Sequence, residues 1–196
     1  MKEQKYMFKV AMVGDSGVGK RTLAKLATIN VLDDNVLNDY GVVFTYYYVH
    51  ASGETDVISA HFSIWDITGL LDVGSLRNRY ERGASGLIAV ADASRRSTVE
   101  NIDSWISHVK DNPDDVDIVL VLNKIDLVAK DELDTIESVM KGYADKYDAE
   151  LFQTSCVDKI NVREPFLGIS KKLCSKVIGE IGTITTIKPK VGAKKS

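Results

Sequence analysis

One short segment limits what this chain can fold into. Residues 14–20 read GDSGVGK, directly after the apolar run YMFKVAMV (6–13) and just before LAKLATI (23–29), whose apolar residues recur at helical spacing. A glycine-rich loop between a buried strand and a helix brings backbone N–H groups together on phosphate oxygens, and Lys20 reaches the outer phosphates. The segment therefore predicts a strand, a phosphate-binding loop and a helix, in that order.

Strand-like and helix-like patterns alternate along the rest of the chain. Further β-rich runs are FTYYYVHA (44–51), VISAHFSIWD (57–66), GLIAVAD (86–92), DIVLVLNK (117–124) and AELFQTS (149–155). The SGET turn between the first two predicts an antiparallel hairpin, and the helical segments between the others predict parallel strands. We therefore expect a doubly wound α/β fold, with a six-stranded mixed sheet flanked by five helices.

Polar clusters stand where four of these strands end. They are Gly14–Thr22, Asp66–Leu70, Asn123–Asp126 and Thr154–Cys156. In open α/β sheets, ligands bind beyond the carboxyl ends of the strands, so these clusters are expected to meet at one edge. The D-x-x-G pattern of Asp66 and Gly69 adds an acid that can hold Mg²⁺ through water and an amide that can approach a terminal phosphate.

The segment NKID (123–126) indicates which base is bound. The Asp126 carboxylate can accept two hydrogen bonds from N1–H and the exocyclic amine of guanine, whereas adenine would leave it unsatisfied. The stem of Lys124 would lie on the base, and Ser155 with the amide of Cys156 would close the far side. The sequence thus predicts a guanine nucleotide.

These segments resemble the Ras superfamily of small GTPases, and the Rab branch most. GDSGVGK, YGVVF, WDITG, YERGASGLIAVADAS, NKID and TSC occur in the family's order and spacing, across roughly residues 6–180. The resemblance implies the P-loop NTPase fold of a Ras-like G domain over residues 1–182, GTP or GDP as the ligand, and effector or regulator proteins that bind segments 39–48 and 66–82.

Motifs and resemblance together assign a set of residues to the nucleotide. They are Gly14, Asp15, Ser16, Gly17, Val18, Gly19, Lys20, Arg21, Thr22, Leu32, Asp66, Gly69, Asn123, Lys124, Asp126, Ser155 and Cys156. Leu32 stands where the family has an aromatic residue that packs on guanine, and it would provide apolar contact instead.

Three positions that serve catalysis in the family are changed. Arg21 replaces the Ser or Thr that binds Mg²⁺, Asp39 replaces the switch I threonine, and Leu70 replaces the glutamine that orients water. Thr22 is one residue further along the helix than Arg21, so its side chain is turned by about 100° from that of position 21 and should point away from the phosphates. Leu70 has no group that can position a water molecule, so we expect hydrolysis to be slow or absent.

Two interpretations of the charged pair remain open. In the first, Arg21 neutralises phosphate oxygens or bridges Asp39 and Asp66, taking the place of the metal. In the second, Arg21 faces solvent, and Asp39 with Asp66 binds Mg²⁺. The functional prediction is a guanine-nucleotide switch or adaptor. The alternatives are an active GTPase whose catalytic groups come from a partner or from Arg77, Arg79 or Arg82, and a scaffold that binds no nucleotide.

Composition excludes several other classes. Apolar residues make up 44% and charged residues 27% of the 196, as in ordinary globular proteins, and no apolar run is long enough to cross a bilayer. The net charge is −3 although residues 183–196 carry four lysines and no acid, so the rest is acidic and unlike a nucleic-acid-binding protein. We expect a cytoplasmic protein. Residues 183–196 are expected to form a flexible basic tail with at most weak membrane contact and, without a terminal cysteine, no prenyl anchor.

Overall fold

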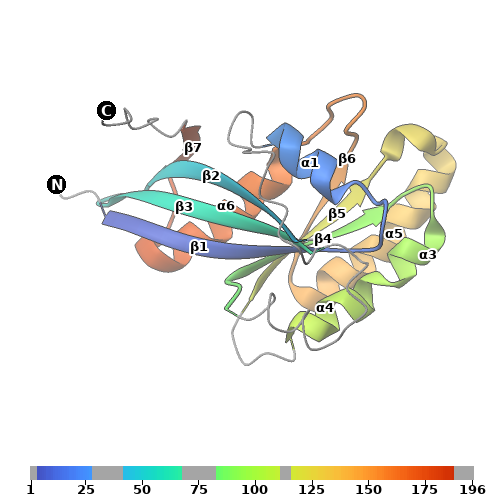
Figure 1. Cartoon of the computed structure of the whole chain (residues 1–196), viewed down its shortest axis with the longest axis horizontal. Helices are drawn as coiled ribbons and strands as arrows, with labels where there is room; N and C mark the ends of the chain where they lie inside the picture. Colours follow the sequence, from blue (N-terminus) through green and yellow to red (C-terminus); the bar gives the residue numbers. More distant parts are fainter. Residues whose placement is uncertain (1–3, 28–41, 68–82, 111–115, 188–196) are drawn as a thin grey trace.

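The chain folds around one seven-stranded sheet, as a computed structural model shows (Figure 1). The structure describes residues 4–27, 42–67, 83–110 and 116–187. The strand order is β6-β5-β4-β1-β3-β2-β7. The parallel strands are β1 (Gln4–Val13), β3 (Val57–Ile67), β4 (Gly86–Asp92), β5 (Asp117–Asn123) and β6 (Glu150–Thr154). The doubly wound α/β fold class is therefore confirmed.

The other edge of the sheet is antiparallel and has one strand more than predicted. β2 (Val42–Ser52) pairs antiparallel with β3, and β7 (Thr183–Ile187) pairs antiparallel with β2. Residues 183–187 were assigned to the tail, so the prediction of six strands was wrong. Their sequence TITTI consists of β-branched residues, which favour strands, and they cover the backbone edge that β2 would otherwise expose.

Helices cover both faces of the sheet (Figure 1). α1 (Lys20–Ala27) and α6 (Glu164–Ile178) pack on one face. α3 (Arg96–Glu100), α4 (Ile102–Lys110) and α5 (Lys130–Tyr147) pack on the other, and the short 3₁₀ helix η1 (Ile125–Leu127) follows β5. Within the described ranges, none of the helices is long and apolar enough to span a membrane.

Two hydrophobic cores result, one on each side of the sheet. On the α1–α6 side, Phe62 stacks on Tyr47 at 4.8 Å between ring centroids, and the Tyr47 hydroxyl bonds Ser170 Oγ at 2.6 Å. On the α3–α5 side, Ile102 and Ile106 pack against alternate residues of the same strands. β4 and β5 are covered on both faces, so they are almost wholly buried, as central parallel strands are. This buried centre holds the strand ends that form the site.

Candidate functional site

The phosphate loop follows β1, and its shape requires glycine. Gly14 and Gly19 have φ of 136° and 101°, values that other residues rarely adopt. A Cβ on Gly14 would lie 2.1 Å from the Val90 carbonyl oxygen, and one on Gly19 would lie 2.3 Å from Asn123 Nδ2. The loop therefore lies in direct contact with the ends of β4 and β5, as the strand-end rule predicts.

Lys20 closes the loop from inside. Its side chain is buried, and Nζ donates hydrogen bonds to the carbonyl oxygens of Gly14 at 2.7 Å and Asp15 at 3.0 Å. Burial lowers the pKa of Lys20, while the carboxylates of Asp66 and Asp15 act in the opposite direction. The ammonium group thus stands at the centre of the loop, where phosphate oxygens would replace the carbonyls as its partners.

The Asp15 side chain points out of the loop. Its carboxylate accepts hydrogen bonds from Asn101 Nδ2 at 2.9 Å and from Trp105 Nε1 at 2.7 Å, between α3 and α4. Asp15 therefore holds the loop to the helices, and only its backbone remains for a phosphate.

Asn123, at the end of β5, joins three of the strand ends. Its Nδ2 donates to the Val18 carbonyl in the phosphate loop at 2.9 Å, and its Oδ1 accepts from Thr154 Oγ1 at 2.8 Å at the end of β6. The Cys156 thiol lies 3.7 Å from the same oxygen, and burial raises its pKa. Asn123 is buried, so its role in this structure is to hold the loops together.

Lys124 and Asp126 differ in their surroundings. Lys124 adopts a left-handed backbone with φ of 63°, and its Nζ pairs with Asp92 Oδ2 at 2.6 Å, which fixes the direction of its stem. Asp126 lies in η1 with an exposed side chain, and within the described ranges its carboxylate receives no hydrogen bond. Ser155 is buried, and its Oγ accepts from the Asp158 amide at 3.0 Å. Of this group, Asp126 has an exposed carboxylate that no described residue engages.

The fourth strand end meets the phosphate loop through Arg21. Its Nε lies 3.9 Å from Asp66 Oδ2, and Asp66 is buried at the end of β3. Burial raises the pKa of Asp66, while the positive charges of Lys20 and Arg21 oppose the shift. Asp66 Oδ1 is buried and has no hydrogen-bond partner among the described residues. The described residues of all four predicted clusters are thus brought to one edge, and Thr22 is exposed beside them.

Among the described residues, one position that binds Mg²⁺ directly in the family is changed. Position 21 offers a guanidinium where a hydroxyl ligand would be needed, and that cation already stands next to Asp66. No group of three or more His, Cys, Asp or Glu side chains within the described ranges is arranged to hold a metal ion. The remaining assigned residues, Leu32, Asp39, Gly69 and Leu70, lie outside the described residues, as do Arg77, Arg79 and Arg82.

Two residues of this edge were missed from the sequence. Asp92 ends β4 and is buried, and it accepts hydrogen bonds from Ser94, from Lys124 and from Arg95 Nε at 2.9 Å. The signal was present, because Asp92 closes the apolar run GLIAVAD in the way that Asp66 and Asn123 close theirs. Nothing in the linear spacing indicates that Arg95 would turn back toward it.

Replacing Asp92 by asparagine is expected to lower stability at neutral pH by about 2 kcal/mol, because two cations lose their carboxylate partner. Burial alone would raise the pKa of Asp92, but hydrogen bonds from Lys124, Ser94 and Arg95 bring it below its ordinary value of 3.8. The stabilisation is therefore present above pH 3.8 and is lost as pH falls through the lower folded value. Urea unfolding from pH 7 to pH 3 should show the two proteins converging in acid. A constant difference would contradict this assignment.

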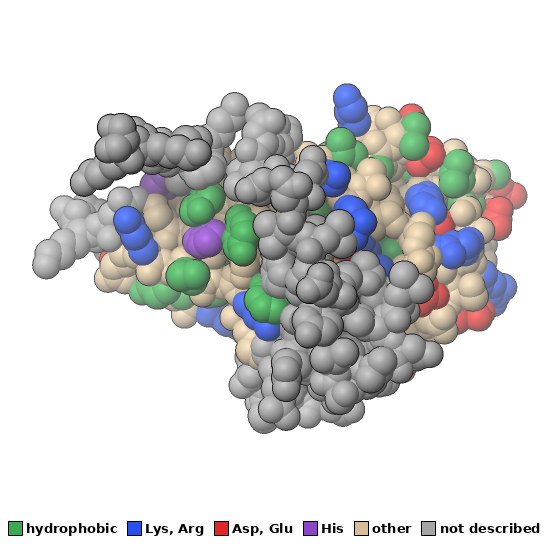
Figure 2. Space-filling model, in the orientation of Figure 1, with side chains coloured by type: hydrophobic (Ala, Val, Ile, Leu, Met, Phe, Trp, Pro, Cys, Tyr) green, Lys and Arg blue, Asp and Glu red, His purple; other side chains and the backbone are tan. Residues whose placement is uncertain are grey.

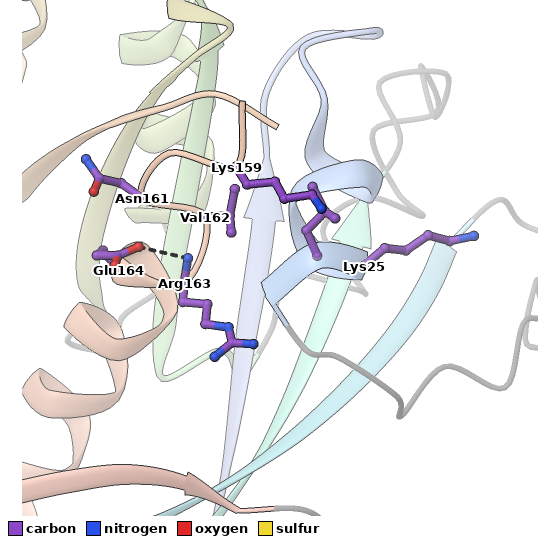
Figure 3. Close-up of a pocket in the computed structure, with 7 residues that line it drawn as sticks. Lys25, Lys159, Asn161, Val162, Arg163 and Glu164 are labelled. Atoms are coloured by element: carbon purple, nitrogen blue, oxygen red, sulfur yellow. Dashed lines mark hydrogen bonds between the residues drawn. The ribbon is translucent and has the colours of Figure 1, made fainter. Parts of the chain in front are cut away.

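A pocket of about 520 Å³ lies between α1 and the segment from Lys159 to Glu164 (Figure 3). Lys159 extends toward α1 from the loop after β6, while Lys25 points away. The lining residues are Lys25, Leu26, Lys159, Asn161, Val162, Arg163 and Glu164. None of the strand-end residues lines this cavity, so it is separate from the predicted nucleotide site.

Comparison with known proteins agrees with this geometry. The model of the Ras family matches residues 9–175. The chain belongs to the Ras family. This Ras-family chain is 32% identical over 183 residues to Ras-related protein rab-11.1 of Caenorhabditis elegans, covering 92% of the chain and 84% of that relative. It is also 30% identical to Ras-related protein Rab-1A of Dictyostelium discoideum, covering 95% of the chain and 90% of the relative.

A third relative is Ras-related protein Rab-11A of Dictyostelium discoideum, 32% identical over 168 residues, covering 85% of the chain and 76% of the relative. The predicted Rab-like character of this Ras-family protein is therefore confirmed. By class it is a GTP-binding small GTPase.

Proposed function

We propose that this protein is a guanine-nucleotide switch or adaptor that hydrolyses GTP slowly or not at all. The observation that carries the proposal is the Arg21 guanidinium, 3.9 Å from the buried Asp66 carboxylate. Asn123 joins the phosphate loop to the base-binding segments, which favours retained nucleotide binding. Position 21, in contrast, carries a cation where the family has a hydroxyl that binds metal. In this proposal binding is kept and catalysis is altered.

Arg21 supplies positive charge at the phosphates. A guanidinium stays charged at every relevant pH and donates to phosphate oxygens in a planar geometry. Its separation of 3.9 Å from Asp66 is longer than a hydrogen bond, so the contact neutralises the carboxylate without fixing the guanidinium in one orientation. The same cation can therefore balance Asp66 and contact β- and γ-phosphate oxygens.

Slow hydrolysis is inferred from Leu70 and Asp39, which stand at the positions of the family's water-orienting glutamine and switch I threonine. Leu70 offers no hydrogen bond to an attacking water molecule. A carboxylate at Asp39, roughly 5 Å from a γ-phosphate, would be repelled by about 3 kcal/mol at an effective dielectric near 20. In this proposal Arg21 supplies the charge of opposite sign that supports binding in spite of this repulsion.

Effector or regulator proteins are proposed to bind segments 39–48 and 66–82. Of these segments the structure describes residues 42–48 and 66–67. Tyr46 and Tyr48 of β2 lie beside His61 of the neighbouring strand β3, with ring centroids 5.2 and 4.5 Å from that of His61. Figure 2 shows hydrophobic and histidine side chains gathered over this half of the sheet. Lys9 Nζ lies 3.9 Å from the Trp65 ring centroid on the neighbouring strand. These aromatic side chains are partly exposed, and aromatic residues are enriched where proteins bind one another, which favours a protein partner.

The test is to identify the nucleotide carried by the purified protein, with and without excess chelator. We expect GDP or GTP to be present, and its affinity to fall by less than about tenfold in EDTA, because Arg21 and not a metal neutralises the phosphates. A large loss on chelation would defeat the role given to Arg21. Protein that binds no nucleotide would favour a scaffold, and multiple-turnover phosphate release would favour an active GTPase.

A further inference from the structure

Arg95 reaches from the start of α3 to the tip of the phosphate loop. Its Nη2 donates to the carbonyl oxygen of Ser16 at 2.9 Å. The same guanidinium lies 3.7 Å from the place where a Cβ on Gly17 would stand. Its Nε is held by the Asp92 carboxylate at 2.9 Å, so the side chain has a fixed direction although it is 43% exposed.

The Asp92 carboxylate connects this contact with the base-binding segment. Oδ2 accepts both Arg95 Nε and Lys124 Nζ, and Oδ1 accepts the amide and hydroxyl of Ser94. The side chain is 1% exposed and fully hydrogen-bonded, as a buried carboxylate must be. One buried group therefore sets the position of a cation at the phosphate loop and of the lysine of NKID.

The orientation of the Ser16–Gly17 peptide group links the hydrogen bond from Arg95 to phosphate binding. A trans peptide is planar, so the carbonyl of Ser16 and the N–H of Gly17 point in opposite directions. When Arg95 holds the Ser16 carbonyl toward α3, the Gly17 N–H points away from α3, to the other side of the loop. Backbone N–H groups turned to one side of such a loop make the concave site that binds phosphate. Gly17 has φ of 75°, which this conformation of the loop requires.

We propose that Arg95 is a positioning residue for the guanine nucleotide: it holds the Ser16–Gly17 peptide with its N–H toward the phosphates, and Asp92 couples that peptide to Lys124. The proposal rests on nucleotide binding, as the proposed function does, but it does not depend on slow hydrolysis. Asp15 acts from the same side of the loop through Asn101 and Trp105, so the loop tip is held at two consecutive residues. Arg95 never needs to touch the nucleotide for this role.

The neighbouring residue Arg96 provides a matched control. It pairs with Glu100 at 3.0 Å on the exposed side of α3, and its side chain is 81% exposed. Replacing either arginine by alanine removes the same charge and the same number of atoms from adjacent positions at the start of α3. Only the Arg95 variant removes a contact with the phosphate loop.

The test measures release of a fluorescent GDP analogue from the full chain carrying Arg95→Ala or Arg96→Ala. Loss of one hydrogen bond from a charged donor is expected to speed release from the Arg95 variant by about 10- to 100-fold, with Arg96→Ala close to the unaltered protein. The thermal shift produced by saturating GDP should also shrink for Arg95→Ala. A role in folding alone would lower the melting temperature without nucleotide and leave that shift unchanged.

Equal release rates for the two variants would overturn the role of Arg95 while leaving nucleotide binding intact. An undiminished GDP-induced thermal shift in Arg95→Ala would overturn it as well. If the unaltered protein bound no GDP, the proposed function would fail first and the Arg95 proposal with it. Arg95→Lys should release GDP faster than the unaltered protein too, because a single ammonium group cannot reproduce the two-sided contact with Asp92 and Ser16.

Discussion

Asp126→Ala is expected to weaken GDP binding by about 10²- to 10⁴-fold, because two hydrogen bonds to a charged acceptor are lost together. The Asp126 carboxylate is exposed in η1, the short helix that begins directly after Lys124. The Lys124 side chain is held in place by its ion pair with Asp92. Within the described ranges no hydrogen bond engages the Asp126 carboxylate, so its four lone-pair sites face whatever ligand enters. Isothermal titration calorimetry with GDP measures the loss.

Specificity should change along with affinity. ADP lacks the N1–H and the exocyclic amine at the guanine position, so its weak binding should hardly respond to Asp126→Ala. The ratio of GDP affinity to ADP affinity is therefore expected to fall by nearly the same factor as the GDP affinity itself. Asp134→Ala is the control, since it removes an equal charge from an exposed site on α5. A variant at position 126 that loses affinity equally for GDP and ADP would show that Asp126 acts on the fold and not on the base.

The fold was predictable because its signals are local. Apolar runs such as GLIAVAD and DIVLVLN fill strands that are buried on both faces. The hairpin loop between β2 and β3, residues 53–56, overlaps the predicted SGET turn and lies one residue further along the chain. Val99, Ile102 and Ile106 recur at helical spacing in the sequence and are buried, although α3 and α4 are separated at Asn101. The missed strand β7 is short and is followed by lysines, so its local signal is weak. It forms because it pairs with β2, which lies far from it in the sequence.

The sequence predicts which strand ends meet at the candidate site. The strand-end rule brings Gly14, Asp66, Asn123 and Thr154 to one edge without any knowledge of side-chain contacts. The rule does not reveal which side chains turn toward one another. The side chain of Asp15, a residue assigned to the phosphates, accepts a hydrogen bond from Trp105, which lies in a helix about 90 positions further along the chain. The Arg95–Asp92–Lys124 contacts are of the same kind.

Leu70→Gln is expected to raise the single-turnover rate of GTP hydrolysis by about 10- to 100-fold. A side chain that orients the attacking water contributes on the order of 10²–10⁴ in enzymes of this kind of chemistry, and the lower part of that range applies while Asp39 and Arg21 remain. Leu71→Gln, at the next position, makes the same chemical change and is the control. Phosphate release after rapid mixing with GTP measures the rate. If the unaltered protein already hydrolyses GTP as fast as Leu70→Gln, Leu70 does not limit the reaction.

The gain in hydrolysis rate from Leu70→Gln should grow when Arg21 and Asp39 are also replaced by the family's hydroxyl residues. Arg21→Ser is expected to affect GTP affinity differently alone and together with Asp39→Thr. Arg21→Ser alone removes the cation that lies 3.9 Å from Asp66, so the Asp66 carboxylate is no longer balanced next to the triphosphate and GTP affinity should fall. Adding Asp39→Thr removes one of the repelling charges and restores two hydroxyl ligands, so affinity should recover and become sensitive to EDTA. The two changes are thus expected to be strongly non-additive, as substitutions of interacting charges are. Purely additive effects on GTP affinity would mean that Arg21 and Asp39 do not act on the same phosphates.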